Sequence, residues 1–457
     1  MTAHFSYLSR RVILACVSAA FLAAPIAAQA ETLADALISA YRNSNIIEQN
    51  RAVLRAADED VAASVATLRP VLEWVARTDI SDNALGQDLS ASLALQGQVL
   101  IYDFGRSNLG VDIAKESVLA TRQALVGVEQ NVLLTAVDAY FNVRQALENV
   151  GINQTSVRVL TQTLQATQDK FDVGEVTRTD VAQAEARLAA ARATLAAAEG
   201  QLVVAREGYK AATGHYPAGL AAAPRPPALP KSPAEARAIA QRSHPSVRQA
   251  QHQAKVADLQ IDAAIAQRMP SLSGSIALRR NSGGTDTSQV GLNLSQTIYS
   301  GGALSSAQRK AIAGRDGARS ALLQSSVIVA QGVGNAWADI EVARAQIAAT
   351  ELQISAATIA YDGVSEEAKL GARTTLDVLD AEQALLAARS SRITAEASLQ
   401  VAFYSLLASM GLLTADHLKL GVPIYDPEAY YNAVKSAPAT SMQGKSLDQV
   451  LKAIGKN

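Results

Sequence analysis

The polar residues with the most telling spacing lie in one turn that occurs twice in the chain. Thr177 and Asp180 stand three residues apart, and Thr374 and Asp377 repeat the pattern. A threonine followed three residues later by a carboxylate is typical of a capping box, which satisfies backbone amides at the start of a helix. Asp380 lies one turn beyond Asp377 on the same helix face. Capping therefore explains Asp180 and Asp377 but gives Asp380 no local role.

No arrangement of residues for catalysis or for a cofactor accompanies these turns. The sequence has no G-x-S-x-G nucleophile motif and no phosphate-binding loop. Its 41 Lys and Arg residues balance 42 Asp and Glu residues, which gives no electrostatic basis for binding nucleic acid. The histidines after residue 30 form no H-x-x-x-H pair and no cluster with cysteine; they are His215, His244, His252 and His417. We therefore predict no enzyme activity, no cofactor, no metal and no nucleic-acid partner.

The repeated turn belongs to a much larger repeat. An offset of 197 residues aligns Gly174 with Gly371 and Tyr102 with Tyr299. Each of the two glycines is expected to end the helix that precedes its capped turn. We predict a mainly α-helical fold with a small β part, built from two tandem structural repeats. The expected segments are a signal peptide at 1–30, a first repeat at 31–216, a proline-rich connector at 217–233, a second repeat at 234–411, and an equatorial segment with a C-terminal tail at 412–457.

Within each repeat, the periodicity predicts one helix, one β-hairpin and one long helical hairpin. The first helices are expected to run without a break from Leu33 to about Leu68 and from Ser232 to Arg268, where a proline follows. The β-hairpins are expected at 71–101 and 271–299, and the helical hairpins at 106–213 and 303–411.

The strands alternate apolar and polar residues, which predicts one apolar face. Leu93 and Leu95 in the first hairpin, and Leu292 and Leu294 in the second, are expected on that face. Strands of about ten residues cross a bilayer when tilted, so these leucines are candidates for contact with lipid. A soluble two-stranded ribbon with one wet face fits the same alternation equally well.

The helical hairpins are predicted to be long and tightly paired. No proline occurs between Arg106 and Asp172 or between 303 and 370, so each outgoing helix would be a rod of about 100 Å. Leucine and alanine recur every seven residues in the return helices, which indicates a coiled-coil seam. The first seam contains Val181, Leu188, Leu195 and Leu202 with Ala184, Ala191, Ala198 and Ala205; the second contains Val378, Leu385, Leu399 and Leu406 with Ala381, Ala388, Ala395 and Ala402.

The N-terminus has the pattern of an export signal. Arg10 and Arg11 precede an apolar stretch, and Ala28 and Ala30 supply the small residues that a signal peptidase requires. A membrane anchor is the alternative, but the apolar stretch is shorter than the roughly 20 residues that span a bilayer. Beyond the signal we expect no apolar run long enough for a membrane helix.

Two copies of helix, β-hairpin and long helical hairpin, with turns of the type V-G-x-x-T-x-T-D-V, resemble the TolC family of outer-membrane efflux and secretion channels. The resemblance covers nearly the whole chain after the signal, and the segment from Gly371 to Glu382 is its most specific part. It implies that three protomers share one twelve-stranded barrel in the outer membrane. It also implies an α-helical tunnel across the periplasm that is closed at the tips of the helical hairpins.

The resemblance also implies roles for residues of the turns. Asp377 and Asp380 match the aspartates that ring the narrowest point of the closed tip. Arg373 matches the arginine that ties one helical pair to its neighbour, and Thr179 and Asp180 match the acceptors of that tie. Ala368 stands where the family has a tyrosine, so one of the usual links at the gate is in doubt.

The predicted function is a passive, trimeric exit duct for a tripartite efflux pump or a type I secretion system. Its expected partners are a periplasmic adaptor protein, an inner-membrane transporter, outer-membrane lipid and the exported small molecules or proteins. The expected location is the outer membrane of a Gram-negative bacterium, with the tunnel extending into the periplasm. The alternative is a periplasmic coiled-coil adaptor that forms no pore.

Overall fold

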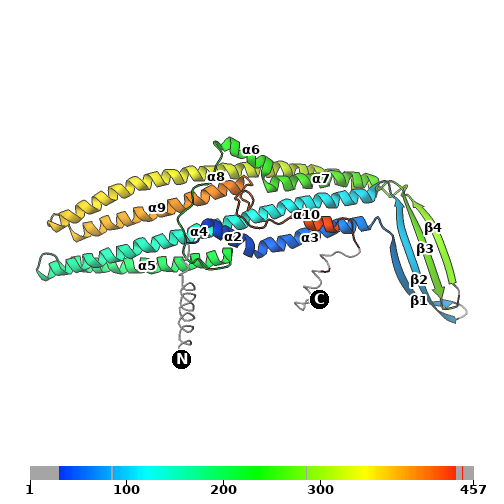
Figure 1. The fold of residues 1–457 in the computed structure, drawn as a ribbon, viewed down its shortest axis with the longest axis horizontal. Helices are drawn as coiled ribbons and strands as arrows, with labels where there is room; N and C mark the ends of the chain where they lie inside the picture. The colour runs from blue at the N-terminus through cyan, green and yellow to red at the C-terminus, as the bar shows by residue number, and fades with distance from the viewer. Residues whose placement is uncertain (1–29, 84–85, 285, 439–444, 446–457) are drawn as a thin grey trace, which may run out of the picture.

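The structure is a computed structural model that describes residues 30–83, 86–284, 286–438 and 445. The predicted signal peptide, apart from Ala30, and most of the predicted C-terminal tail lie outside the described residues. The molecule is elongated, with a four-stranded sheet at one end and the turns of two helical hairpins at the other (Figure 1). The predicted fold class is confirmed: two copies of helices, a β-hairpin and a long helical hairpin follow one another along the chain.

The described elements follow the same order in both repeats. The first repeat contains α2 (Leu33–Asn43), α3 (Asn45–Ala66), β1 (Val71–Asn83), β2 (Gly86–Tyr102), α4 (Arg106–Asp172) and α5 (Arg178–Thr213). The second repeat contains α6 (Pro233–Ser243), α7 (Pro245–Ala266), β3 (Ser271–Asn281), β4 (Asp286–Ser295), α8 (Ala303–Lys369) and α9 (Thr375–Ser409), and α10 (Pro427–Val434) follows.

The prediction of one unbroken helix at the start of each repeat is wrong. Ser44 adopts an extended conformation between α2 and α3, and its side chain accepts a hydrogen bond from the Ile47 amide. In the second repeat, His244 is extended and Pro245 begins α7. A proline is tolerated in the first turn of a helix, because its missing N–H would have no partner there, but not in the helix interior. The breaks let α2 and α6 pack at the middle of the molecule, while α3 and α7 run along the outgoing helices toward the sheet (Figure 1).

In each long helical hairpin, the return helix packs on the outgoing helix through residues of the predicted heptad seam. Leu188 and Leu385 are buried, and Ala388 is completely inaccessible to solvent. Ala191 is only partly buried, against a small cluster formed by Leu160, Leu188 and Leu379. In α9 the seam departs from the predicted phase at its start, where Leu379 is buried and Val378 is only half-buried. This shift occurs because α9 packs on α4 and α5 as well as on α8.

The four strands form one antiparallel sheet in the order β1-β2-β3-β4. Leu95 lies opposite Trp74 on one side and Leu278 on the other, and Val290 lies opposite Ile276. Directly opposed residues share a face, so the register assembles the alternating apolar residues of all four strands on one face. The other face carries polar residues, among them Glu73, Gln96, Gln98, Ser273, Ser275, Gln289 and Asn293.

The main core lies at the middle of the molecule, where the two repeats meet. Tyr140, Leu133 and Leu406 are completely buried there, together with residues of α2, α6 and the segment after α9. A smaller cluster around Leu54 and Val61 packs α3 on α4 beneath residues of α10 and the preceding segment. The sequence pattern predicted no helix after residue 411, where α10 lies.

One of the described helices, α5, is long and apolar enough by length and composition to cross a membrane. The expectation that no such segment follows the signal is therefore wrong. The hydropathy of α5 comes from its alanine-rich sequence, and α5 runs antiparallel to α4 for its whole length (Figure 1). We interpret it as one arm of the first helical hairpin.

Candidate functional site

The turns of the two helical hairpins lie side by side at the end of the molecule opposite the sheet (Figure 1). A hollow of about 710 Å³ separates them, and its lining includes Asp180, Arg373 and Lys170. Gly174 and Gly371 occupy equivalent positions in the turns, with φ angles of 82° and 78°. These angles lie in the left-handed region, where a side chain is unfavourable, so each turn requires glycine at this point.

Both predicted capping boxes are present in the structure. The Thr177 hydroxyl donates to Asp180 Oδ2 at 2.7 Å, and the Thr177 amide donates to the same oxygen at 2.9 Å. At the second turn, the Thr374 amide and hydroxyl donate to Asp377 Oδ2 at 3.0 and 2.9 Å. These hydrogen bonds favour the ionised carboxylates and lower the pKa of both Asp180 and Asp377. Both residues therefore stay charged at neutral pH.

Arg373 contacts a residue that the sequence analysis did not name. Its Nε donates to Glu367 Oε2 at 2.8 Å, and this pair raises the pKa of the guanidinium. Within the described chain, Arg373 makes no hydrogen bond or ion pair with Thr179 or Asp180. It does line the same hollow as Asp180, and Thr179 is exposed at the same tip.

Lys170 joins the two helical hairpins next to their turns, at Ala368. The ammonium group of Lys170, near the end of α4, donates to the backbone carbonyl of Ala368 in α8 at 3.3 Å. The contact uses a backbone acceptor, so the side chain at position 368 is not needed for it. No sequence signal distinguishes Lys170 from the other lysines near a helix end.

Asp380 has a local partner that spacing along the chain could not indicate. Arg187 Nη2 of α5 lies 2.5 Å from Asp380 Oδ1 of α9, and the other guanidinium nitrogen binds the Gln383 side chain. The two residues come from different repeats, 193 positions apart in sequence. No pattern in the sequence identifies Arg187 as this partner, because pairing between the repeats depends on how the two hairpins lie against each other.

The apolar face of the sheet is the second candidate site. Leu93, Leu95, Leu292 and Leu294 all lie on this face by strand register. In the single chain the face is open: Leu292 is 74% exposed and Val290 is 80% exposed. A contiguous apolar surface spread over four strands is unfavourable in water, so it marks a contact with lipid or with protein.

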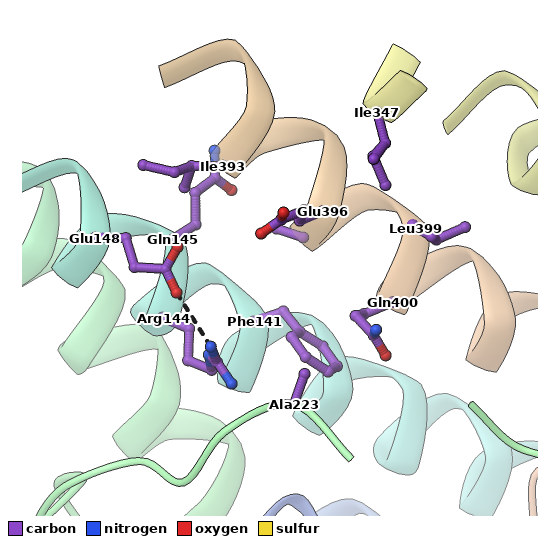
Figure 2. Close-up of a pocket in the computed structure, with 11 residues that line it drawn as sticks. Phe141, Arg144, Gln145, Glu148, Ala223, Ile347, Ile393, Glu396, Leu399 and Gln400 are labelled. Carbon is purple, nitrogen blue, oxygen red and sulfur yellow. Dashed lines mark hydrogen bonds and ion pairs between the residues drawn. The ribbon is translucent and has the colours of Figure 1, made fainter. Parts of the chain in front are cut away.

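A second hollow, of about 140 Å³, lies between α4, α8, α9 and the connector (Figure 2). Its charged residues are already paired: Arg144 binds Glu148 at 3.1 Å, and Glu396 binds Arg392 at 2.7 Å. Phe141 is buried at this site. The arrangement joins helices and offers no free acid–base pair for catalysis. Among the residues that the structure describes, no group of His, Cys, Asp or Glu side chains could hold a metal ion.

Comparison with known proteins places this architecture in a family. The model of the outer membrane efflux protein family matches residues 36–215 and 237–412. The chain is 35% identical to outer membrane efflux protein BepC of Brucella suis over 420 residues, which cover 90% of this chain and 91% of the relative. It is 25% identical to outer membrane protein TolC of Escherichia coli over 74% of each chain.

Solved structures agree with the fold. The chain superimposes on crystal structures of CusC with a TM-score of 0.74, covering 82% of this chain and 91% of the other at 21% identity. The two family-model matches, at residues 36–215 and 237–412, coincide closely with the two repeats. The chain belongs to the family of outer membrane efflux proteins of Gram-negative bacteria.

Proposed function

We propose that this protein is the trimeric exit duct of an efflux pump or a type I secretion system. The observation that carries the proposal is the four-stranded sheet with one continuous, exposed apolar face. Four strands cannot close into a barrel, since membrane barrels need about eight or more. Three copies would supply twelve strands, would pair the free edges of β1 and β4, and would turn the apolar face toward lipid.

The helical hairpins would form the wall of a tunnel in the same assembly. Each outgoing helix has 67 residues, so the rods are about 100 Å long, far longer than helices in globular domains. Exposed apolar residues along α8, such as Leu323, Leu352 and Ile359, would be covered by neighbouring protomers. The duct itself is passive, and a periplasmic adaptor with an inner-membrane transporter would deliver the cargo, either small molecules or proteins.

The hairpin turns would form the gate. Asp377 and Asp380 of three protomers would surround one axis, where crowded carboxylates attract polyvalent cations. In the closed state Arg373 would bind Thr179 and Asp180 of the adjacent protomer. Its ion pair with Glu367 would then break or be shared with these new partners. The exposure of Arg373 and Thr179 in the single chain supports this role, because both side chains are accessible to a neighbouring molecule.

The competing function is a periplasmic adaptor that forms no pore. Such a protein needs one coiled-coil hairpin and a soluble β domain. This chain has two hairpins and a sheet whose apolar face has no covering layer among the described residues. These features favour the duct.

The test is to extract the protein in mild detergent, establish its mass in solution, and record its conductance in planar bilayers. A duct gives a trimer that dissociates on heating and conducts ions. The double variant Asp377→Ala with Asp380→Ala should lose block by trivalent cations while the trimer persists. A monomer that does not conduct would refute the proposal and favour the adaptor.

A further inference from the structure

Two arginines lie on the polar face of the sheet, in the half that is remote from the helices (Figure 1). By register, Arg77 of β1 lies opposite Ser92, and Arg279 of β3 lies opposite Ala94, two residues further along β2. Side chains two residues apart on a strand share a face, so both arginines belong to the face that carries Gln96. Both side chains are exposed, and neither makes an ion pair among the described residues.

The burial of Ala94 shows that long side chains fold over this part of the sheet. Ala94 is only 2% exposed, although among the described elements the strands pack extensively only on one another. An alanine in a single layer is covered by side chains of the adjoining strands. Its direct neighbours are Val75 and Arg279, and its diagonal neighbours on β1 are Glu73 and Arg77. The long apolar stems of the arginines have the reach to complete this cover.

The spacing lets both guanidinium groups reach one small anion. Arg77 and Arg279 are two strands and two residues apart. With strands about 4.8 Å apart and a rise of about 3.4 Å per residue, their Cα atoms are roughly 12 Å from each other. An extended arginine side chain places its guanidinium carbon about 6 Å from Cα. The two guanidinium groups can therefore meet above Ser92 and Ala94.

Two carboxylates of β1 share the face and set the limits of the site. Asp79 lies on the side toward the end of β1, and Glu73 lies on the side toward the helices. The residues directly beside Arg279 on β2 and β4 are Ala94 and Thr287, which carry no charge. Two cations and one carboxylate thus border Ala94, and the excess of charge there is positive.

We propose that Arg77 and Arg279 form a binding site for phosphate, sulfate or carboxylate groups on the inner wall of the barrel. The inference rests on the proposed function, in which the polar face of the sheet lines the lumen, and it adds anionic cargo as a substrate class. The planar fork of arginine binds two oxygens of such a group at once. A lumen with low-dielectric walls strengthens the attraction. The site would draw anionic cargo into the outer part of the duct, at the opposite end from the carboxylates of the tip.

Block by inorganic tripolyphosphate in planar bilayers tests the site. The anion is added on the side that the barrel faces, and it should block the parent protein. Arg77→Gln and Arg279→Gln should each raise the blocking concentration about tenfold, because each removes a charged hydrogen bond to the anion. Block that is unchanged in both variants would overturn the proposal.

The matched control is Arg280→Gln. Arg280 is the next residue of β3, points to the opposite face and pairs with Asp286 at 3.7 Å. A phosphate of a lipid would meet this face, whereas cargo in the lumen would meet Arg279. Arg280→Gln should therefore leave the block unchanged, and an equal loss of block in Arg280→Gln and Arg279→Gln would overturn the assignment to the lumen.

Glu73→Gln gives a test of opposite sign. This variant removes the carboxylate that borders Ala94 on the same face, so it should lower the blocking concentration of tripolyphosphate. A weaker block in Glu73→Gln would contradict the site, because it would place the anion away from the charges around Ala94.

Calorimetry on the full-length protein in detergent tests the site even if the protein forms no channel. The parent should bind tripolyphosphate, and the double variant Arg77→Gln with Arg279→Gln should not, while the two keep the same melting temperature because both side chains are exposed. Binding that the double variant loses, in a protein that does not conduct, would count against the duct alone. Equal binding by parent and double variant, in a protein that conducts, would overturn the anion site alone.

Discussion

Val290→Arg is the sharpest test of which face of the sheet meets lipid. Val290 is central in β4, opposite Ile276, and it is 80% exposed in the single chain. An arginine on the lipid face costs about 2–4 kcal/mol at the bilayer midplane, so three copies would cost roughly 6–12 kcal/mol per trimer. We expect the variant to fail to insert, measured as loss of the heat-dissociable trimer from the outer-membrane fraction.

The cost of an arginine on the lipid face falls from the bilayer midplane toward the interface, which gives a second prediction. Leu294 shares the face with Val290 but lies four residues nearer the end of β4. At about 3.4 Å per residue and a tilt of about 40°, it is roughly 10 Å closer to the interface. Leu294→Arg should therefore cost only about 0–1 kcal/mol per chain and should still assemble.

The matched control is Gln289→Arg, one residue away on the polar face, opposite Ala277. This variant should insert normally and change the ion selectivity of the conducting trimer instead. Equal loss of assembly for Val290→Arg and Gln289→Arg would refute the assignment of the faces.

Three further predictions concern residues outside the sheet. Ala388→Glu places a charge in a seam with no free volume and should abolish trimers in native gels, whereas the neighbouring exposed Ala387→Glu should assemble. Asp58 is completely buried without a hydrogen-bond partner among the described residues, and burial raises its pKa to about 6. The folded protein thus keeps this proton after the unfolded chain has lost it, so stability should fall by roughly 2 kcal/mol from pH 4 to pH 7. Asp58→Asn should remove that part of the pH dependence in thermal melts, and an unchanged profile would show that Asp58 does not titrate there. Glu31 accepts a hydrogen bond from Tyr209 at 2.5 Å, so Glu31→Ala should cost about 1.5–3 kcal/mol of stability, and an unchanged melting temperature would show that this contact is not structural.

Much of the architecture follows from local sequence. The two long hairpins can be predicted from the sequence because proline is absent from the outgoing helices, alanine and leucine recur every seven residues in the return helices, and glycine precedes each capped turn. The capping of Asp180 and Asp377 involves residues only three positions apart, so it depends on the chain alone. The alternation in the strands likewise predicted one apolar face, because the side chains of a strand alternate with a fixed period of two.

Contacts between distant segments depended on the tertiary structure. The breaks at Ser44 and His244 separate helices that pack differently, and the helical periodicity of the sequence could not show where each break falls. The register that gathers Trp74, Leu95 and Leu278 on one face is a property of three strands from two repeats.

Asp380 is the clearest example of a residue whose helix face follows from the sequence but whose partner depends on the tertiary structure. By itself the sequence determined that Asp380 lies on the same helix face as Asp377 and that its counterpart in the first repeat is uncharged. Only the packing of α9 on α5 decided that Arg187 is its partner, since 193 residues separate the two. Periodicity along the chain fixes which face of a helix a residue occupies, but the identity of the opposing residue is set by how the two hairpins pack, and that depends on the side chains of both repeats at once.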